Sequence, residues 1–392
     1  MQRDRIRGAQ RAAGLRSGGV RRSGAGASTV DGAGAAGGVG GAGGTGGVGG
    51  PGAVDRRVVW IAGVIGLVAA LAVWVTLAWQ ASDRSEDDLA TRGFRGEIST
   101  EKAFRAVAYD PDGTRIYAAT GNAVTVWHTA TRRTTGRPFT GHDSTVTALA
   151  VSPDGRLLAT TGDDATTRLW DTTTRAEIGG PIDTGIVVRA VALAFSPDGS
   201  LLAVAGDGGT ALWDVAGKRL LGPLESASGA HAAVAFGPDG TRIATGDVNG
   251  GTVTIWDVAT RQQVGEPLGG HAGNGPVTAV AYDASGTWLA DGSTDKASFV
   301  YNTLTGEHTE FRQNEEAVHT VLLSDDARRL VTVSSQDVII WDVPSVTQVG
   351  RPVAPDGSAD VKGVALAPDG DTLAVIRDHR MQFWSLRAAS RR

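Results

Sequence analysis

Residues 141–171 read GHDSTVTALAVSPDGRLLATTGDDATTRLWD, and this stretch sets the pattern for most of the chain. An alternating apolar run, Val146–Val151, precedes the turn Pro153-Asp154-Gly155, and a second apolar run starts at Leu157. Proline fixes φ at the second position of a turn and glycine accepts a positive φ, so the two runs are expected to form a hairpin. A third run ends on Trp170-Asp171. The stretch therefore predicts three antiparallel strands, with a short fourth strand completing the unit.

The unit recurs along the chain. The aromatic residues that close successive units are Trp127, Trp170, Trp213, Trp256, Tyr301, Trp341 and Trp384, at intervals of 43, 43, 43, 45, 40 and 43 residues. The Pro-Asp-Gly turn recurs at 111–113, 153–155, 197–199, 238–240 and 368–370, and residues 283–286 and 325–327 take its place in the other two units. A four-strand unit of 40–45 residues is typical of a propeller blade.

The units resemble WD repeats, through the Gly-His pairs at 141–142 and 270–271 and the Trp-Asp pairs such as Trp170-Asp171. The resemblance covers about residues 93–392 and is to a bacterial, membrane-anchored form of the family. It implies an all-β fold, a seven-bladed WD-repeat β-propeller. The chain ends eight residues after Trp384, so residues 93–99 are expected to supply the outer strand of blade 7 and close the ring, which removes an exposed edge.

The resemblance also implies a structural hydrogen-bond tetrad in blade 2, formed by His142, Thr160, Asp164 and Trp170. The same residue types occur in catalytic triads, but the resemblance assigns them to blade rigidity. In blade 5 the tryptophan is replaced by Tyr301, which has no indole N–H. Replacing Asp295 there is therefore expected to cost less stability than replacing Asp164 in blade 2.

Two columns of small residues on the inner strands are expected to face the central channel. One column is Ala106, Ala148, Ala192, Ala233, Ala279, Thr320 and Gly363, and the other is Ala108, Ala150, Ala194, Ala235, Ala281, Leu322 and Ala365. Neither column contains an acid, a base or a metal ligand. We therefore expect no catalytic, cofactor or metal site and no enzymatic activity. The alternative is a propeller hydrolase or ligand sensor with a site at the central channel.

The residues at the start of each inner strand should lie on the rim where WD-repeat propellers commonly bind partners. They are Arg105, Thr147, Val191, Ala232, Thr278, His319 and Lys362. Arg105, His319 and Lys362 are the candidate partner-binding residues, and the alternative is that they are simply solvated. The predicted function is a membrane-anchored scaffold that binds a protein or peptide partner through the propeller.

Residues 58–79 read VVWIAGVIGLVAALAVWVTLAW and contain no charge. A helix of this length spans about 33 Å, which matches a hydrocarbon core of about 30 Å. A cleavable signal peptide would need a shorter basic region and a small-residue cleavage site, so a single-pass transmembrane helix is favoured. Arg56 and Arg57 precede the segment and an acidic stretch follows it. These charges predict a cytoplasmic N-terminus and an extracytoplasmic propeller at the cell membrane.

The remaining segments are strongly biased in composition. Residues 1–57 form a basic, Gly-rich arm with nine arginines and three aspartates, a net charge of +6, and residues 80–92 form an acidic linker. We expect the arm to be disordered and cytoplasmic. Because the chain carries −5 overall, the rest holds −11, which argues against a nucleic-acid partner. Ala62, Gly66 and Ala70 form a small-residue face that predicts weak helix-mediated self-association.

Overall fold

The computed structural model describes residues 93–386, except residues 186, 188, 225–228, 272, 274 and 350–359. The predicted arm (1–57), transmembrane segment (58–79) and acidic linker (80–92) lie outside the described residues. Among the residues that are described, no helix is long and apolar enough to cross a membrane.

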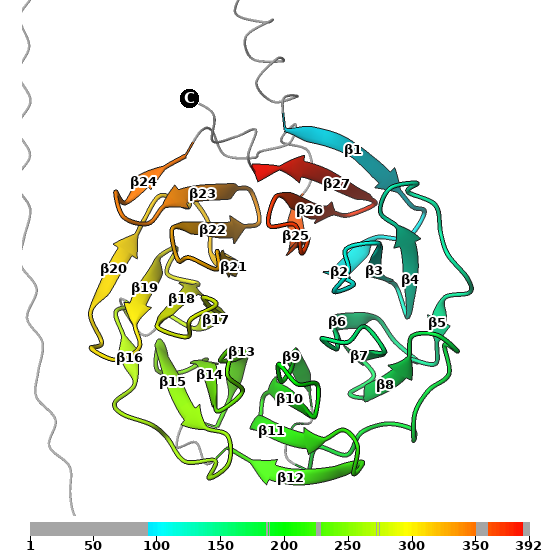
Figure 1. Cartoon of the computed structure of the whole chain (residues 1–392), viewed down its shortest axis with the longest axis horizontal. Helices are drawn as coiled ribbons and strands as arrows, with labels where there is room; N and C mark the ends of the chain where they lie inside the picture. The colour runs from blue at the N-terminus through cyan, green and yellow to red at the C-terminus, as the bar shows by residue number, and fades with distance from the viewer. Residues whose placement is uncertain are drawn as a thin grey trace, which may run out of the picture. The chain divides into compact units, whose positions relative to one another are not determined.

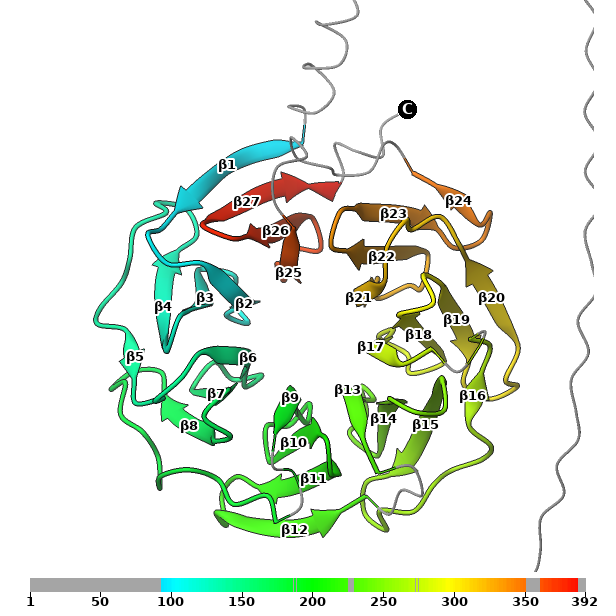
Figure 2. The ribbon, with the colours of Figure 1, turned by 180° about the vertical axis from the view of Figure 1, so that it is seen from behind.

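The described chain folds into seven antiparallel sheets arranged around a central axis (Figures 1 and 2). The seven-bladed, all-β propeller predicted from the repeat is therefore confirmed. Six blades have four strands, and blade 2 has three. A fourth segment in blade 2 makes only isolated bridges, Thr167 with Ile182 and Trp170 with Glu177.

The strands of blades 1–4 follow the chain from the inner to the outer edge. They are β2 (Phe104–Tyr109), β3 (Arg115–Thr120), β4 (Ala123–His128) and β5 (Phe139–Thr140) in blade 1; β6 (Val146–Val151), β7 (Leu157–Gly162) and β8 (Thr167–Asp171) in blade 2; β9 (Ala190–Phe195), β10 (Leu201–Gly206), β11 (Gly209–Asp214) and β12 (Arg219–Pro223) in blade 3; and β13 (His231–Phe236), β14 (Arg242–Asp247), β15 (Thr252–Asp257) and β16 (Leu268–Gly269) in blade 4.

Blades 5–7 continue the same order until the last outer strand. They contain β17 (Val277–Tyr282), β18 (Trp288–Ser293), β19 (Ser298–Asn302) and β20 (His308–Phe311) in blade 5; β21 (Val318–Leu323), β22 (Arg329–Ser334), β23 (Val338–Asp342) and β24 (Thr347–Gln348) in blade 6; and β25 (Val361–Leu366), β26 (Thr372–Arg377), β27 (Arg380–Ser385) and β1 (Phe94–Ser99) in blade 7.

The outer strand of blade 7 is the first strand of the described chain. β1 pairs antiparallel with β27, from Phe94 opposite Trp384 to Ser99 opposite Arg380 (Figure 1). The rings of Phe94 and Trp384 meet edge to face with centroids 5.3 Å apart. Blade 7 thus joins the two ends of the described chain, and β1 covers the edge that β27 would otherwise expose.

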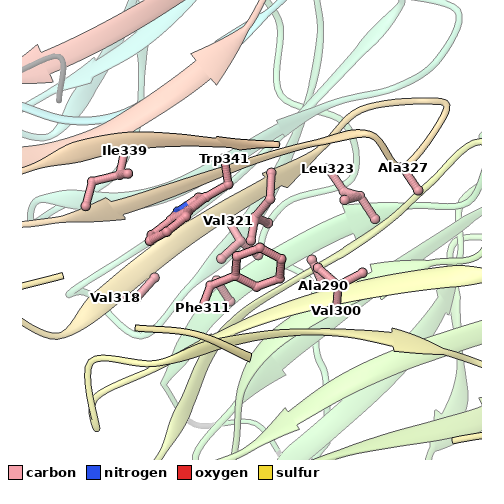
Figure 3. Close-up of a cluster of buried hydrophobic side chains, with 11 residues drawn as sticks. Ala290, Val300, Phe311, Val318, Val321, Leu323, Ala327, Ile339 and Trp341 are labelled. Atoms are coloured by element: carbon pink, nitrogen blue, oxygen red, sulfur yellow. The ribbon is translucent and has the colours of Figure 1, made fainter. Parts of the chain in front are cut away.

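The hydrophobic core lies between blades, on both faces of each sheet. Between blades 5 and 6, Phe311 and Trp341 pack edge to face with centroids 5.4 Å apart (Figure 3). Ala106 packs into the core between blades 1 and 2, whereas its neighbour Val107 packs between blades 7 and 1. The expectation that one face of each inner strand points at the channel is therefore wrong for β2. A radial sheet has a neighbouring blade on each side, so both faces are covered.

Candidate functional site

Each inner strand carries one β-bulge at its second residue. In blade 1, Phe104 pairs with Thr120 and Ala106 pairs with Ala119, so Arg105 is the extra residue. The same shift recurs in the other six blades, and the seven bulged residues are Arg105, Thr147, Val191, Ala232, Thr278, His319 and Lys362. A bulge kinks the strand and re-aims a side chain. The rim column read from the sequence is thus a ring of seven bulges.

These seven residues define one end of the propeller, which we call the bulge face. The opposite end carries the Pro-Asp-Gly turns, and we call it the turn face. In blade 3 the bulge packs closely against its partner strand, because a Cβ placed on Gly206 would lie 2.0 Å from the Arg189 carbonyl oxygen. Glycine also stands opposite the bulge in β7, β14 and β18.

The three candidate contact residues lie on adjacent blades, but they differ in exposure. Arg105 is exposed and forms no salt bridge with any residue that the structure describes. Lys362 is partly exposed, and its Nζ lies 3.0 Å from Asp360 Oδ2. His319 is half-buried, with Nδ1 3.1 Å from Thr320 Oγ1, and burial lowers the pKa of its imidazole. The bulge face therefore presents two cationic side chains, while the imidazole of His319 is largely covered.

Val191 is a further exposed residue of the bulge face, which reasoning from the sequence did not select. It is 44% exposed, the highest value among the bulged apolar residues. It stands in the same column as Arg105 and Lys362, so its position in the repeat was the available signal.

The blade 2 tetrad residues form one connected hydrogen-bond network. His142 Nε2 lies 2.8 Å from Thr160 Oγ1, and His142 Nδ1 lies 2.9 Å from Asp164 Oδ2. The indole N–H of Trp170 donates to Thr160 Oγ1 over 2.8 Å. Burial alone would raise the pKa of Asp164, but hydrogen bonds from Thr166 and His142 outweigh it and hold that pKa below its usual value. With His142 and Thr160 buried, the network ties the blade together and offers no open face to a substrate.

Other blades keep parts of this network. Trp256 donates to Thr245 over 2.8 Å, and Trp341 donates to Thr332 over 2.9 Å. In blade 7 the buried Trp384 Nε1 has no hydrogen-bond partner among the described residues. Val375 stands two residues after the strand partner of Trp384, at the position of the threonines, and it has no hydroxyl. Whether the indole N–H of the closing tryptophan finds an acceptor thus depends on one residue of the second strand.

Blade 5 contains a charged version of the network that the sequence did not reveal. Asp291 takes the place of the threonine, and Tyr301 Oη donates to its Oδ2 over 3.0 Å. His271 lies between two carboxylates, with Nε2 2.9 Å from Asp291 Oδ2 and Nδ1 3.0 Å from Asp295 Oδ1. A weaker network was expected here because Tyr301 has no indole N–H, and that expectation left out its hydroxyl group. Tyr301 supplies a hydroxyl donor instead, and Asp291 supplies the acceptor.

Within residues 93–386, apart from the undescribed positions, no group of three or more His, Asp or Glu residues could hold a metal ion.

Comparison with known sequences places this geometry in a family context. Four segments, residues 133–171, 178–214, 226–257 and 262–302, match the WD domain, G-beta repeat. These matches support a WD-repeat family. The matched WD repeats end on the residue after Trp170, Trp213, Trp256 and Tyr301, at the end of the third strand of a blade. The first and last of the matched repeats, 133–171 and 262–302, also contain the outer strand of the preceding blade, β5 and β16, the same offset that places β1 in blade 7.

Several curated proteins are similar to this chain. The guanine nucleotide-binding protein subunit beta of Arabidopsis thaliana is 32% identical over 182 residues, 44% of this chain and 48% of that protein. A periodic tryptophan protein 2 homolog of Dictyostelium discoideum is 27% identical over 235 residues, 57% of this chain and 24% of that protein. The chain thus spans about half, or less, of the length of these two relatives. Neither relative's name denotes an enzymatic activity.

Proposed function

We propose that this chain is a membrane-anchored scaffold that binds a protein or peptide partner at the bulge face of its propeller. The observation that carries the proposal is the ring of seven bulges, which sets one irregular residue per blade at the same end of the propeller. The WD-repeat matches support a protein-interaction scaffold. Arg105, Lys362 and Val191 combine charge and exposed apolar surface, which suits contact with another protein.

The first strand fixes the end of the propeller at which the described chain begins. Ser99 pairs with Arg380, which pairs with Arg377, and Arg377 pairs with Val361 beside Lys362. Phe94 lies at the other end of β1, on the turn face. A tether that precedes residue 93 therefore joins the propeller on the turn face.

The proposed anchor follows from the charge pattern of the sequence. Residues 58–79 cross the cell membrane once, the arginines of residues 1–57 hold the N-terminus in the cytoplasm, and the propeller lies on the extracytoplasmic side. The Ala62, Gly66 and Ala70 face supports a weak association between anchors. The net acidic charge of the rest of the chain leaves nucleic acid out of the proposal.

A charge-reversal experiment tests this function. The full-length chain is purified from its own cells with bound proteins, as the parent, as Arg105→Glu/Lys362→Glu, and as the control Arg156→Glu/Arg328→Glu on the turn face. Both double variants change the charge equally, and Arg156 and Arg328 are exposed. Partner recovery should fall about tenfold, or about 1.4 kcal/mol, only for the bulge-face variant. Equal recovery from both double variants contradicts a bulge-face contact.

The experiment also separates the scaffold from an enzymatic propeller. One equivalent of metal per chain in the purified protein, found by elemental analysis, would favour a hydrolase with a channel site. Retention of a small molecule in place of a protein would favour a ligand sensor. The scaffold predicts a protein partner whose recovery depends on the bulge face.

A further inference from the structure

Blade 5 encloses a histidine between two carboxylates. The side chains of His271 and Asp291 are fully buried, and that of Asp295 is 10% exposed. Asp291 also accepts hydrogen bonds from Tyr301 Oη and from the Phe299 backbone N–H, at 3.0 and 2.9 Å. Two donors therefore converge on the Asp291 carboxylate independently of His271, which fits its ionised form.

The geometry fixes the protonation of His271 more tightly than that of His142. Both ring nitrogens of His271 face aspartate oxygens, and an ionised carboxylate can only accept hydrogen bonds. Both nitrogens must therefore carry a hydrogen, which only the imidazolium form provides. In blade 2, Nε2 of His142 faces the Thr160 hydroxyl, which can donate. Neutral His142 completes its network with a single ring hydrogen.

Several charged and polar groups face this site from the surrounding elements. Arg312, after β20, lies 3.8 Å from Asp295 Oδ2, and its side chain is 47% exposed. The Phe299 ring meets His271 edge to face, 4.8 Å between centroids, and His308 contacts the rings of Phe299 and Tyr301. The two aspartates and His271 carry a net charge of −1 when His271 is protonated, and Arg312 offsets it from the surface.

The network connects two segments at the bulge face. His271 lies before β17, whereas Asp295 lies in the turn between β18 and β19. The same segments share two further hydrogen bonds: Thr294 N–H donates to the Pro276 carbonyl over 3.1 Å, and Ser293 Oγ donates to the Gly275 carbonyl over 3.0 Å. The side chain of His271 is the charged part of this connection.

We propose that His271, Asp291 and Asp295 form a proton-operated latch, which holds these two segments of the bulge face together while His271 is protonated and loosens when it loses its proton. In the neutral imidazole one nitrogen lone pair faces a carboxylate lone pair, so one contact becomes repulsive. The latch does not depend on the identity of any partner.

The direction of the pH effect follows from the surroundings of His271. Burial by itself would lower the pKa of the imidazole, but the hydrogen bond and charge of Asp291, followed by those of Asp295, raise it above its usual value. A raised folded-state pKa gives stabilisation that is complete below the unfolded pKa of about 6.5. That stabilisation is lost as the pH rises through the folded-state pKa. The latch is therefore closed at mildly acidic pH and opens toward alkaline pH.

Hydrogen exchange on the full-length protein in detergent micelles tests the latch. Thr294 N–H reports on blade 5, and the equivalent Asp163 N–H, which donates to Thr145 O over 2.8 Å, reports on blade 2 in the same molecule. With rates corrected for intrinsic exchange, protection of Thr294 should fall about tenfold or more between about pH 6 and pH 9, as His271 loses the proton that it shares with the two aspartates. Protection of Asp163 should change by less than about twofold.

A substitution provides the second arm of the test. Asp291→Thr restores the neutral hydroxyl found at Thr160, so the loss of Thr294 protection at alkaline pH should disappear. The latch is ruled out if Thr294 of the parent keeps its protection at pH 9, or if the pH dependence persists in Asp291→Thr. The comparison of Thr294 with Asp163 in the parent is decisive even if the variant does not fold.

Discussion

Tyr301 donates its hydroxyl to Asp291 over 3.0 Å, in the place where Trp170 of blade 2 donates its indole N–H to Thr160. Both acceptors stand two residues after the strand partner of the closing aromatic residue, since Leu289 pairs with Tyr301 and Leu158 pairs with Trp170. One position of the second strand therefore determines whether a blade is tied by a neutral or by a charged network.

Removal of the Tyr301 hydroxyl should destabilise the propeller. Tyr301→Phe leaves the buried Asp291 carboxylate one donor short, and we expect a loss of about 1–3 kcal/mol in the free energy of unfolding. Tyr109→Phe is the control, because the buried Tyr109 hydroxyl has no hydrogen-bond partner among the described residues. That change should be neutral or slightly stabilising. Denaturant titration measures both, and equal losses would contradict the role of Tyr301.

Replacement of the aspartate in each network should cost stability in both blades. Asp164→Ala removes an acceptor for His142 and for the Thr166 and Asp143 backbone, a loss of about 1–3 kcal/mol. Asp295→Ala should cost at least as much, because it leaves a buried imidazolium with one partner fewer. Paired thermal melts decide the order. A clearly higher melting temperature for Asp295→Ala than for Asp164→Ala would show that the blade 5 network is the weaker one.

Ala165 occupies a backbone conformation that suits glycine. Its φ is +59° in the turn between β7 and β8, and its side chain is exposed. Ala165→Gly should therefore raise the free energy of unfolding by about 0.5–1 kcal/mol. Ala176 is an exposed alanine of the same blade without a positive φ, so Ala176→Gly should give no gain. A gain in both variants would show that backbone strain at Ala165 is not the cause.

Deletion of the closing strand should weaken the ring. Without residues 93–99, β27 loses its outer partner and presents an unpaired edge. We expect a lower melting temperature or concentration-dependent aggregation, followed by calorimetry and light scattering. A truncated protein that melts like the parent and stays monomeric would show that blade 7 does not need β1.

The proposed topology predicts a protection pattern in cells. Protease added to intact cells should digest the propeller and spare residues 1–57, because the flanking arginines hold that arm in the cytoplasm. Antibodies against tags at the two ends report the fragments. A propeller that survives until the cells are lysed would place it on the cytoplasmic side.

The repeat predicted the number of blades because a 43-residue spacing reflects one local hairpin pattern copied along the chain. The bulges were not predicted, since a bulge is a mismatch between two strands and appears only when Arg105 is counted against Thr120 and Ala119. The repeat showed that Arg105 occupies the same position as one residue in every other blade, but it did not show that a bulge occurs there. The covered state of His319 likewise depends on packing against the neighbouring blade.

The blade 5 network escaped prediction for a different physical reason. Asp291 lies within the buried part of β18, where a carboxylate is costly unless it is paired. Its partner His271 stands 20 residues earlier in the chain. In blade 2 the position of Asp291 is occupied by Thr160. The available signal was Asp291 in the second strand of a blade whose closing tryptophan is replaced by Tyr301. The sequence does not show that Asp291 contacts both Tyr301 and His271, because these residues lie on separate segments that meet only in the folded blade.

The pairing of Phe94 with Trp384 determines when the ring can close during synthesis. The two residues are 290 positions apart in the chain, so the ribosome completes six blades before the partner of the first strand exists. At about 5–20 residues per second, that interval lasts roughly 15–60 s. Throughout it β1 has no sheet to join, and the nascent ring is an open arc with a free edge. The newly made chain is therefore most exposed to mispairing with its neighbours just before β27 is made, when chaperone protection would matter most.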